Sequence, residues 1–106
     1  MNIENINEII KTKPSVSIYF SGIGCGVCEV LQTKIKKALD ENFPLIDQYY
    51  LDIEEYKQIA ISFNVFVMPT LLVFIDGKEF IRKSRNMSVD ELITTLKRPY
   101  QLFFEN

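Results

Sequence analysis

Residues 16–28 have the sequence VSIYFSGIGCGVC, in which three kinds of local structure follow one another. Residues 16–20 are rich in β-branched and aromatic side chains, which is typical of a buried strand. Two glycines then interrupt the strand and predict a loop at residues 21–24. From the first cysteine onward apolar residues recur every four positions, so we expect a helix over about residues 25–42. The two cysteines therefore stand where a glycine-rich loop becomes a helix.

Two capping boxes mark the starts of later helices. Asp52, followed three residues later by Glu55, predicts a helix that begins just after a strand. Ser88, with Glu91 at the same spacing, opens the last helix of the chain. Since proline cannot continue a helix, we expect this last helix to end before Pro99.

The remaining signals complete the order of elements. They predict a helix over about 3–11, a strand at 48–53, a strand at 70–75 and, after an Asp76-Gly77 hairpin turn, a strand at 80–83. The order is then α-β-α-β-α-β-β-α, with parallel crossovers between strands that helices separate and an antiparallel hairpin at the end. The sequence therefore predicts an α/β fold, a three-layer sandwich with a mixed central sheet, as a single domain over residues 1–106.

Composition excludes several function classes. A chain of 106 residues has room for one domain with one ordinary core. Its 12 basic and 14 acidic side chains give a net charge of −2, so we expect no nucleic-acid partner. It contains no histidine, which excludes every catalytic triad, dyad or metal site that needs imidazole. The remaining chemistry is that of thiols, carboxylates, amines and backbone.

The chain also lacks the signals of export and membrane insertion. Residues 1–8 contain neither a basic segment nor a continuous apolar run, so we expect no signal peptide. The longest apolar stretch, 65–75, is interrupted by Pro69 and is far too short to span a membrane. Two cysteines cannot form a secreted disulfide framework. We therefore expect a soluble protein of the reducing cytoplasm with no membrane partner.

Cys25 and Cys28 are the candidate catalytic residues. The unpaired N–H groups and the dipole at a helix start favour a negative charge, so a thiolate at Cys25 would be stabilised. Cys28, one turn further along, could attack a mixed disulfide on Cys25 and release the product. The sequence thus predicts Cys25 as the nucleophile and Cys28 as the resolving thiol.

Two other interpretations of the pair stay open. Free cysteines are often small buried apolar residues with no chemical role. A metal site needs about four ligands, and one chain offers only this pair and carboxylates, so it would have to lie between two subunits. We expect neither a metal nor a cofactor.

At this point the sequence resembles the thioredoxin family, over about residues 14–97. The resemblance rests on Cys25-Gly26-Val27-Cys28, on residues 67–74 (VMPTLLVF) and on Asp76-Gly77-Lys78. It implies the thioredoxin-like fold, a redox disulfide between Cys25 and Cys28, and protein disulfides as substrates. It also implies a cis Pro69 beside the cysteines and a Met68 backbone that pairs with extended substrate chains. The implied substrate-binding residues are Gly24, Met68, Pro69 and Arg85.

The sequence departs from the family pattern around this site. Gly24 stands where the family usually has a tryptophan. Tyr19 and Tyr50 align with the family's buried acid and its lysine partner. Arg85 aligns with a glycine in the loop that faces the cysteines, so it adds a cation and bulk beside the groove. We expect this cation to favour acidic segments near the target disulfide. The alternative is a solvated arginine that points away from the groove.

Two hypotheses of function follow. The first is a thiol–disulfide oxidoreductase that reduces protein disulfides and takes electrons from a reductase or a low-molecular-weight thiol. The second is a non-catalytic thioredoxin-fold binding module in which the cysteines no longer react. The aromatic tail, residues 99–106, either folds back or contacts another chain. We expect it to fold back and the protein to be a monomer, with a dimer through the tail as the alternative.

Overall fold

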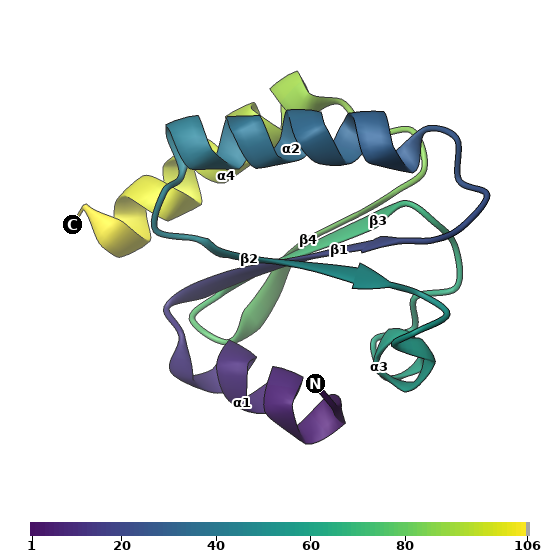
Figure 1. The fold of residues 1–106 in the computed structure, drawn as a ribbon. Helices are drawn as coiled ribbons and strands as arrows, with labels where there is room; N and C mark the ends of the chain where they lie inside the picture. The colour runs from purple at the N-terminus through teal and green to yellow at the C-terminus, as the bar shows by residue number, and fades with distance from the viewer. Residues whose placement is uncertain (106) are drawn as a thin grey trace.

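The computed structural model describes residues 1–105, and its elements follow the expected order. They are α1 (Ile3–Thr12), β1 (Ser15–Ser21), α2 (Cys28–Asn42), β2 (Asp47–Asp52), α3 (Lys57–Ser62), β3 (Thr70–Ile75), β4 (Lys78–Ser84) and α4 (Val89–Phe104). A central sheet lies between α2 and α4 on one face and α1 and α3 on the other (Figure 1). The predicted three-layer α/β sandwich is confirmed. Within residues 1–105 no helix combines the length and apolarity needed to cross a membrane.

The sheet has four strands in the order β2-β1-β3-β4. The pair β1 and β2 is parallel, whereas β3 runs antiparallel to both β1 and β4. The expectation of a parallel crossover into β3 was wrong. A six-residue helix such as α3 advances the chain by only about 9 Å, whereas a six-residue strand runs about 20 Å. The chain therefore re-enters the sheet at the end where β2 left it, and β3 points back.

Alternate residues of the central strands form two separate cores. Tyr19 of β1 and Leu71 and Val73 of β3 face α2 and α4, while their neighbours Phe20 and Leu72 face α1 and α3. All five side chains are almost completely buried. This two-sided burial explains why the strand sequences are apolar runs and do not alternate with polar residues.

The motif at Asp52 differs in one detail from its prediction, whereas the Asp76-Gly77 hairpin turn forms as predicted. The carboxylate of Asp52 accepts hydrogen bonds from the N–H groups of Glu54 and Glu55, at 2.8 and 3.1 Å. It caps a turn, and α3 begins later, at Lys57. At the hairpin, Asp76 and Gly77 both have positive φ, 54° and 76°, as a two-residue hairpin turn of this type requires.

The last helix does not end before Pro99, and that prediction was wrong. α4 continues to Phe104 with Pro99 inside it. Tyr100 is buried and packs edge-on against Phe43, with ring centroids 5.0 Å apart. Its hydroxyl accepts a hydrogen bond of 3.1 Å from the N–H group of Leu45. These contacts offset the cost of a proline in a helix, which is about 3 kcal/mol.

Candidate functional site

Several loops meet at one end of the sheet. The register places Phe20 of β1 opposite Thr70, Ser21 opposite Asp52, and Thr70 opposite Ser84. The last residues of β1, β2 and β4 therefore lie at the same end of the sheet as the first residue of β3. This arrangement brings together the cysteine loop, the turn before β3 and the loop after β4, although they are far apart in the sequence.

Cys25 and Cys28 form a disulfide, with their Cα atoms 5.4 Å apart. Cys28 is only 3% exposed, whereas Cys25 is half-buried and reaches the surface. The helix begins at Cys28 and not at Cys25, so Cys25 lies in a turn before it, closed by a 3.3 Å bond from the Cys28 N–H group to the Cys25 carbonyl. Cys25 is thus the accessible residue of the pair, and Cys28 is enclosed.

The start of α2 has no side-chain cap. Its N-cap residue is Val27, which has no oxygen to accept from the first-turn N–H groups. The dipole of this helix favours negative charge at its start, and Cys25 lies within three residues of it. The dipole of α2 therefore still favours a thiolate at Cys25, although Cys25 lies in the turn before the helix and not in its first turn.

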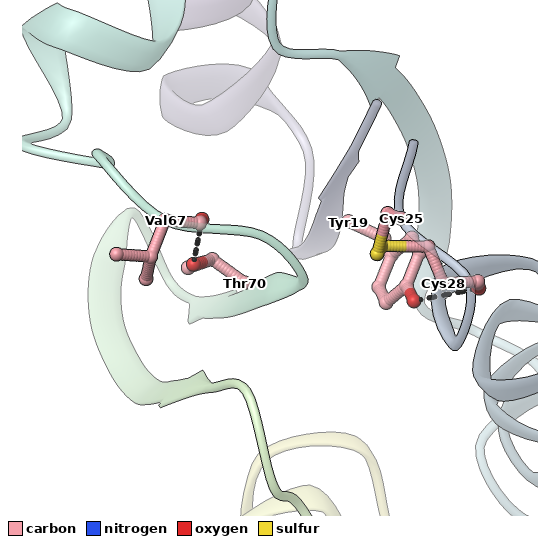
Figure 2. Close-up of a disulfide and its surroundings, with 5 residues drawn as sticks. All are labelled: Tyr19, Cys25, Cys28, Val67 and Thr70. Atoms are coloured by element: carbon pink, nitrogen blue, oxygen red, sulfur yellow. Dashed lines mark hydrogen bonds between the residues drawn. A yellow bond between two sulfur atoms is a disulfide. The ribbon is translucent and has the colours of Figure 1, made fainter. Parts of the chain in front are cut away.

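The turn before β3 lies opposite the disulfide in Figure 2. Its Met68–Pro69 peptide bond is cis. The Thr70 hydroxyl donates a 2.7 Å hydrogen bond to the Val67 carbonyl, and this bond closes the turn. The Pro69 carbonyl accepts a 2.8 Å bond from the Arg85 N–H group. The backbone of the turn is therefore held from within and from the loop after β4.

The sequence reasoning missed Gly22 as a residue of this site. A Cβ atom at Gly22 would lie 2.7 Å from the Met68 sulfur and 3.3 Å from a methyl carbon of Ile53. A glycine there lets the Met68 side chain pack directly against the loop that leads to Cys25. The pair of glycines in this loop was a signal for a turn, and only the fold shows that one of them also makes room for Met68.

Tyr19 contacts the backbone of Cys28, and Tyr50 lies next to Tyr19. The Tyr19 hydroxyl donates a 2.8 Å hydrogen bond to the Cys28 carbonyl (Figure 2), and its ring lies 5.9 Å from that of Tyr50. Burial raises the pKa of Tyr19 to about 12. Burial, followed by the charge of Asp40, raises the pKa of Tyr50 to about 12 as well. Both side chains are therefore neutral at physiological pH, and neither can act there as a base.

The other two predicted binding residues also lie at this end of the sheet. Gly24 is exposed, directly before Cys25. Arg85 is exposed in the loop after β4 and borders two clefts, one lined by Met68 and Val67 and one lined by Val27. Gly24, Met68, Pro69 and Arg85 thus lie at the end of the sheet that carries the disulfide. Within residues 1–105 no three histidine, cysteine or acidic side chains lie close enough to hold a metal ion.

The fold and the site define an α/β protein with a thioredoxin-like sheet and a disulfide-forming CXXC pair at the start of a helix. The family model described as Thioredoxin matches residues 1–98. "Thioredoxin-like protein YdfQ" of Bacillus subtilis is 35% identical over 102 residues, covering 96% of this chain and 90% of that protein. "Thioredoxin-1" of Saccharomyces cerevisiae is 39% identical over 64 residues, 60% of this chain and 61% of that protein. The chain belongs to the thioredoxin family.

Solved structures agree with this assignment at the level of the fold. A thioredoxin from Trypanosoma brucei brucei has a TM-score of 0.81 at 19% identity, covering 94% of this chain and 87% of its own. Thioredoxin O2 of Arabidopsis thaliana in its oxidized state has a TM-score of 0.76 at 22% identity, covering 93% and 90%. At these identities the likeness shows the fold alone.

Proposed function

We propose that this protein is a thiol–disulfide oxidoreductase that reduces disulfides in other proteins. The observation that supports this most is the unequal exposure of the bonded pair, with Cys25 accessible and Cys28 only 3% exposed. A nucleophile must reach an external disulfide, whereas a resolving thiol has to reach only the nucleophile. The thioredoxins among its relatives catalyse chemistry of this kind.

The reaction has two exchange steps. The Cys25 thiolate attacks one sulfur of the substrate disulfide, the substrate S–S bond breaks, and the released substrate thiolate takes up a proton. The Cys28 thiolate then attacks the Cys25 sulfur, which breaks the mixed disulfide and releases the second substrate thiolate, and this thiolate takes up a proton. Two electrons pass from the pair to the substrate, and the pair ends as the disulfide present in this structure.

Regeneration needs an external electron donor. We assign this role to a reductase or a low-molecular-weight thiol, which reduces the Cys25–Cys28 disulfide back to two thiols. Strongly oxidising pairs stabilise their thiolate with added positive charge, and the two residues between these cysteines, Gly26 and Val27, supply none. We therefore expect a potential below roughly −200 mV. A protein with so low a potential acts as a reductant, and we place it in the cytoplasm, which is a reducing compartment.

The surface around the pair would hold the substrate chain. We assign backbone pairing with an extended substrate segment to Met68, whose neighbour Pro69 is fixed by the Arg85 N–H bond. Gly24 leaves open space before Cys25, since no atom outside its two chain neighbours lies within 4 Å of where its Cβ would be. Tyr100 and Phe104 pack against each other within the same chain, with ring centroids 4.6 Å apart, which supports a monomer over a dimer through the tail.

Alkylation of the reduced protein with iodoacetamide across pH tests the proposal. We expect Cys25 to react with a pKa below the free-thiol value of about 8.5, and the protein to reduce insulin disulfides in the presence of dithiothreitol. In Cys28→Ser, mixed disulfides on Cys25 should accumulate and identify the targets. A pKa near 8.5 together with no insulin reduction would instead identify a binding module, the reading that the two tyrosines beneath the disulfide favour.

A further inference from the structure

A second cleft lies on the side of α2 and is lined by Gly26 and Val27, the two residues between the cysteines. Its apolar lining comes from Val27, Val30, Leu31 and Met87, and its cations are Lys34 and Arg85. We call it the α2 cleft. In Figure 1 the connection from β4 to α4 passes beside the first turn of α2, which explains how Met87 and Arg85 come to face that helix.

Two apolar side chains that line the α2 cleft are exposed and are not part of the core. Val27 is 63% exposed and Val30 is 60% exposed. They are three residues apart, so they lie on the same side of the helix, next to the accessible Cys25. Apolar side chains gathered beside a reactive group, outside the core, indicate a surface that contacts another molecule.

The two cations of the α2 cleft have no acidic partner in the part of the chain that the structure describes. The ion pairs formed within residues 1–105 are Lys13–Asp47, Lys36–Asp40, Arg82–Glu79 and Lys83–Glu91. Neither Lys34 nor Arg85 takes part in one, and no acidic side chain lines the cleft. The cleft therefore combines apolar surface with uncompensated positive charge, on a protein whose net charge is −2.

The backbone of Arg85 gives an independent argument. Its φ is +60°, in the left-handed region that side chains other than glycine and asparagine adopt at a cost. A glycine at this position would adopt the same φ without that cost. Strained residues of this kind gather at functional sites, where the side chain serves a purpose other than stability.

We propose that the α2 cleft binds the chain segment that flanks the target disulfide, and that it selects segments in which apolar residues are accompanied by carboxylates. The inference rests on the proposed function and specifies its substrate class. Apolar residues of the segment would cover Val27 and Val30, and its carboxylates would lie between Lys34 and Arg85. The occupant is thus an acidic, amphipathic stretch of a substrate protein.

The test uses three peptide disulfides that are identical except for the two residues flanking the cysteine, which are Glu, Gln or Lys. The reduced protein is mixed with each peptide, and the second-order rate constant is divided by that of dithiothreitol with the same peptide. This ratio removes the intrinsic effect of the flanking charge on thiol exchange. Two exposed charge contacts of about 0.5 kcal/mol each lead us to expect a preference for Glu over Lys peptides of about fivefold at low salt, which falls towards one in 0.5 M NaCl.

Three variants locate the effect. Arg85→Asn removes the charge but keeps a residue that tolerates positive φ, and Lys34→Gln removes a charge from an exposed helix surface, where folding is not at risk. Each should lower the Glu-to-Lys preference about twofold. Lys11→Gln is the matched control, because it removes one exposed charge from α1 on the opposite face of the sheet, and it should leave the preference unchanged.

The outcomes separate this inference from the proposed function. Equal rates on the three peptides, or an equal loss of preference in Lys11→Gln, would overturn the acidic-segment inference and leave the oxidoreductase intact. Failure to reduce any of the three peptides would overturn the proposed function, and the inference with it. A preference that falls in both cleft variants and not in the control supports it.

Discussion

The phenolic hydroxyl of Tyr19 donates a hydrogen bond of 2.8 Å to the main-chain carbonyl of Cys28. The ring is 1% exposed, so the bond lies in the interior, between the end of β1 and the first turn of α2. The enclosed sulfur is thus positioned through a neutral hydroxyl. A hydroxyl that does not ionise near neutral pH can hold the backbone of Cys28, but it cannot take the proton of its thiol.

Removal of this hydroxyl should weaken the fold. We expect Tyr19→Phe to lower the free energy of unfolding by about 1 kcal/mol, the net value of one buried hydrogen bond. Urea unfolding of the oxidised protein measures the difference. Tyr49→Phe is the control, because no hydrogen bond of the Tyr49 hydroxyl is present within residues 1–105, and its change should stay below about 0.5 kcal/mol. Equal losses in both variants would show that the Tyr19–Cys28 bond adds no stability.

The second exchange step should depend on pH. Because Tyr19 has a pKa of about 12, no base at that position takes the Cys28 proton at neutral pH. We expect the mixed disulfide on Cys25 to decay slowly at pH 6 and faster towards pH 9, as Cys28 ionises by itself. Tyr19→Asp should speed the decay at neutral pH and reduce stability, since its neighbour Tyr50 offers the new carboxylate no cation.

Rapid-mixing kinetics of mixed-disulfide decay from pH 6 to 9 in both proteins measures this effect. A decay in the wild type that does not change with pH would mean that water or another carboxylate takes the proton. The role that we give Tyr19 in the timing of the second step would then be wrong.

Alkaline pH should destabilise the protein through both tyrosines. Their pKa values of about 12 in the folded chain lie above the unfolded value of 10.0. The unfolded state therefore loses these protons first, so stability is full below pH 10 and falls as pH rises towards 12. Thermal unfolding followed by circular dichroism, with tyrosinate absorbance recorded alongside, should show this fall. Tyr19→Phe should show a shallower one, and identical slopes in the two proteins would contradict the assignment.

The left-handed conformation at Arg85 predicts a stabilising substitution. Arg85→Gly relieves a strain of about 1–2 kcal/mol and loses about 0.4–1 kcal/mol through the greater freedom of the unfolded chain. We expect a net gain of between zero and about 1.6 kcal/mol in urea unfolding. Asn86→Gly is the control, because Asn86 does not have a positive φ and should only lose stability. Destabilisation by both substitutions would mean that Arg85 is not strained.

Tyr100, the buried residue of the tail, should matter more for stability than for association. We expect Tyr100→Ala to cost about 3 kcal/mol, because it removes a buried ring and the hydroxyl that accepts from Leu45. Phe103 is 40% exposed, and Phe103→Ala should cost less than about 1 kcal/mol. Sedimentation of the wild type should show a monomer. A dimer that dissociates in Phe103→Ala would instead place the tail in an interface between chains.

Local signals in the chain were sufficient to predict the layered architecture and to single out the cysteine pair that forms the disulfide. The buried runs of β1 and β3, the Asp76-Gly77 turn and the capping residue Ser88 each act over a few residues, where side-chain shape and backbone hydrogen bonds dominate. The spacing of Cys25 and Cys28 is likewise local, since two residues between cysteines let the sulfurs meet across one turn. Such preferences act before distant parts of the chain come together, so a single sequence reveals them.

Long-range packing set the remaining features. The direction of β3 depends on where the chain re-enters the sheet after α3, and the passage of α4 through Pro99 depends on the contact of Tyr100 with Phe43. The approach of Met68 to Gly22 and the placement of Arg85 between two clefts join segments separated by dozens of residues. Local sequence patterns do not predict these contacts. The free energy that stabilises them comes from burying surfaces that meet only in the folded chain.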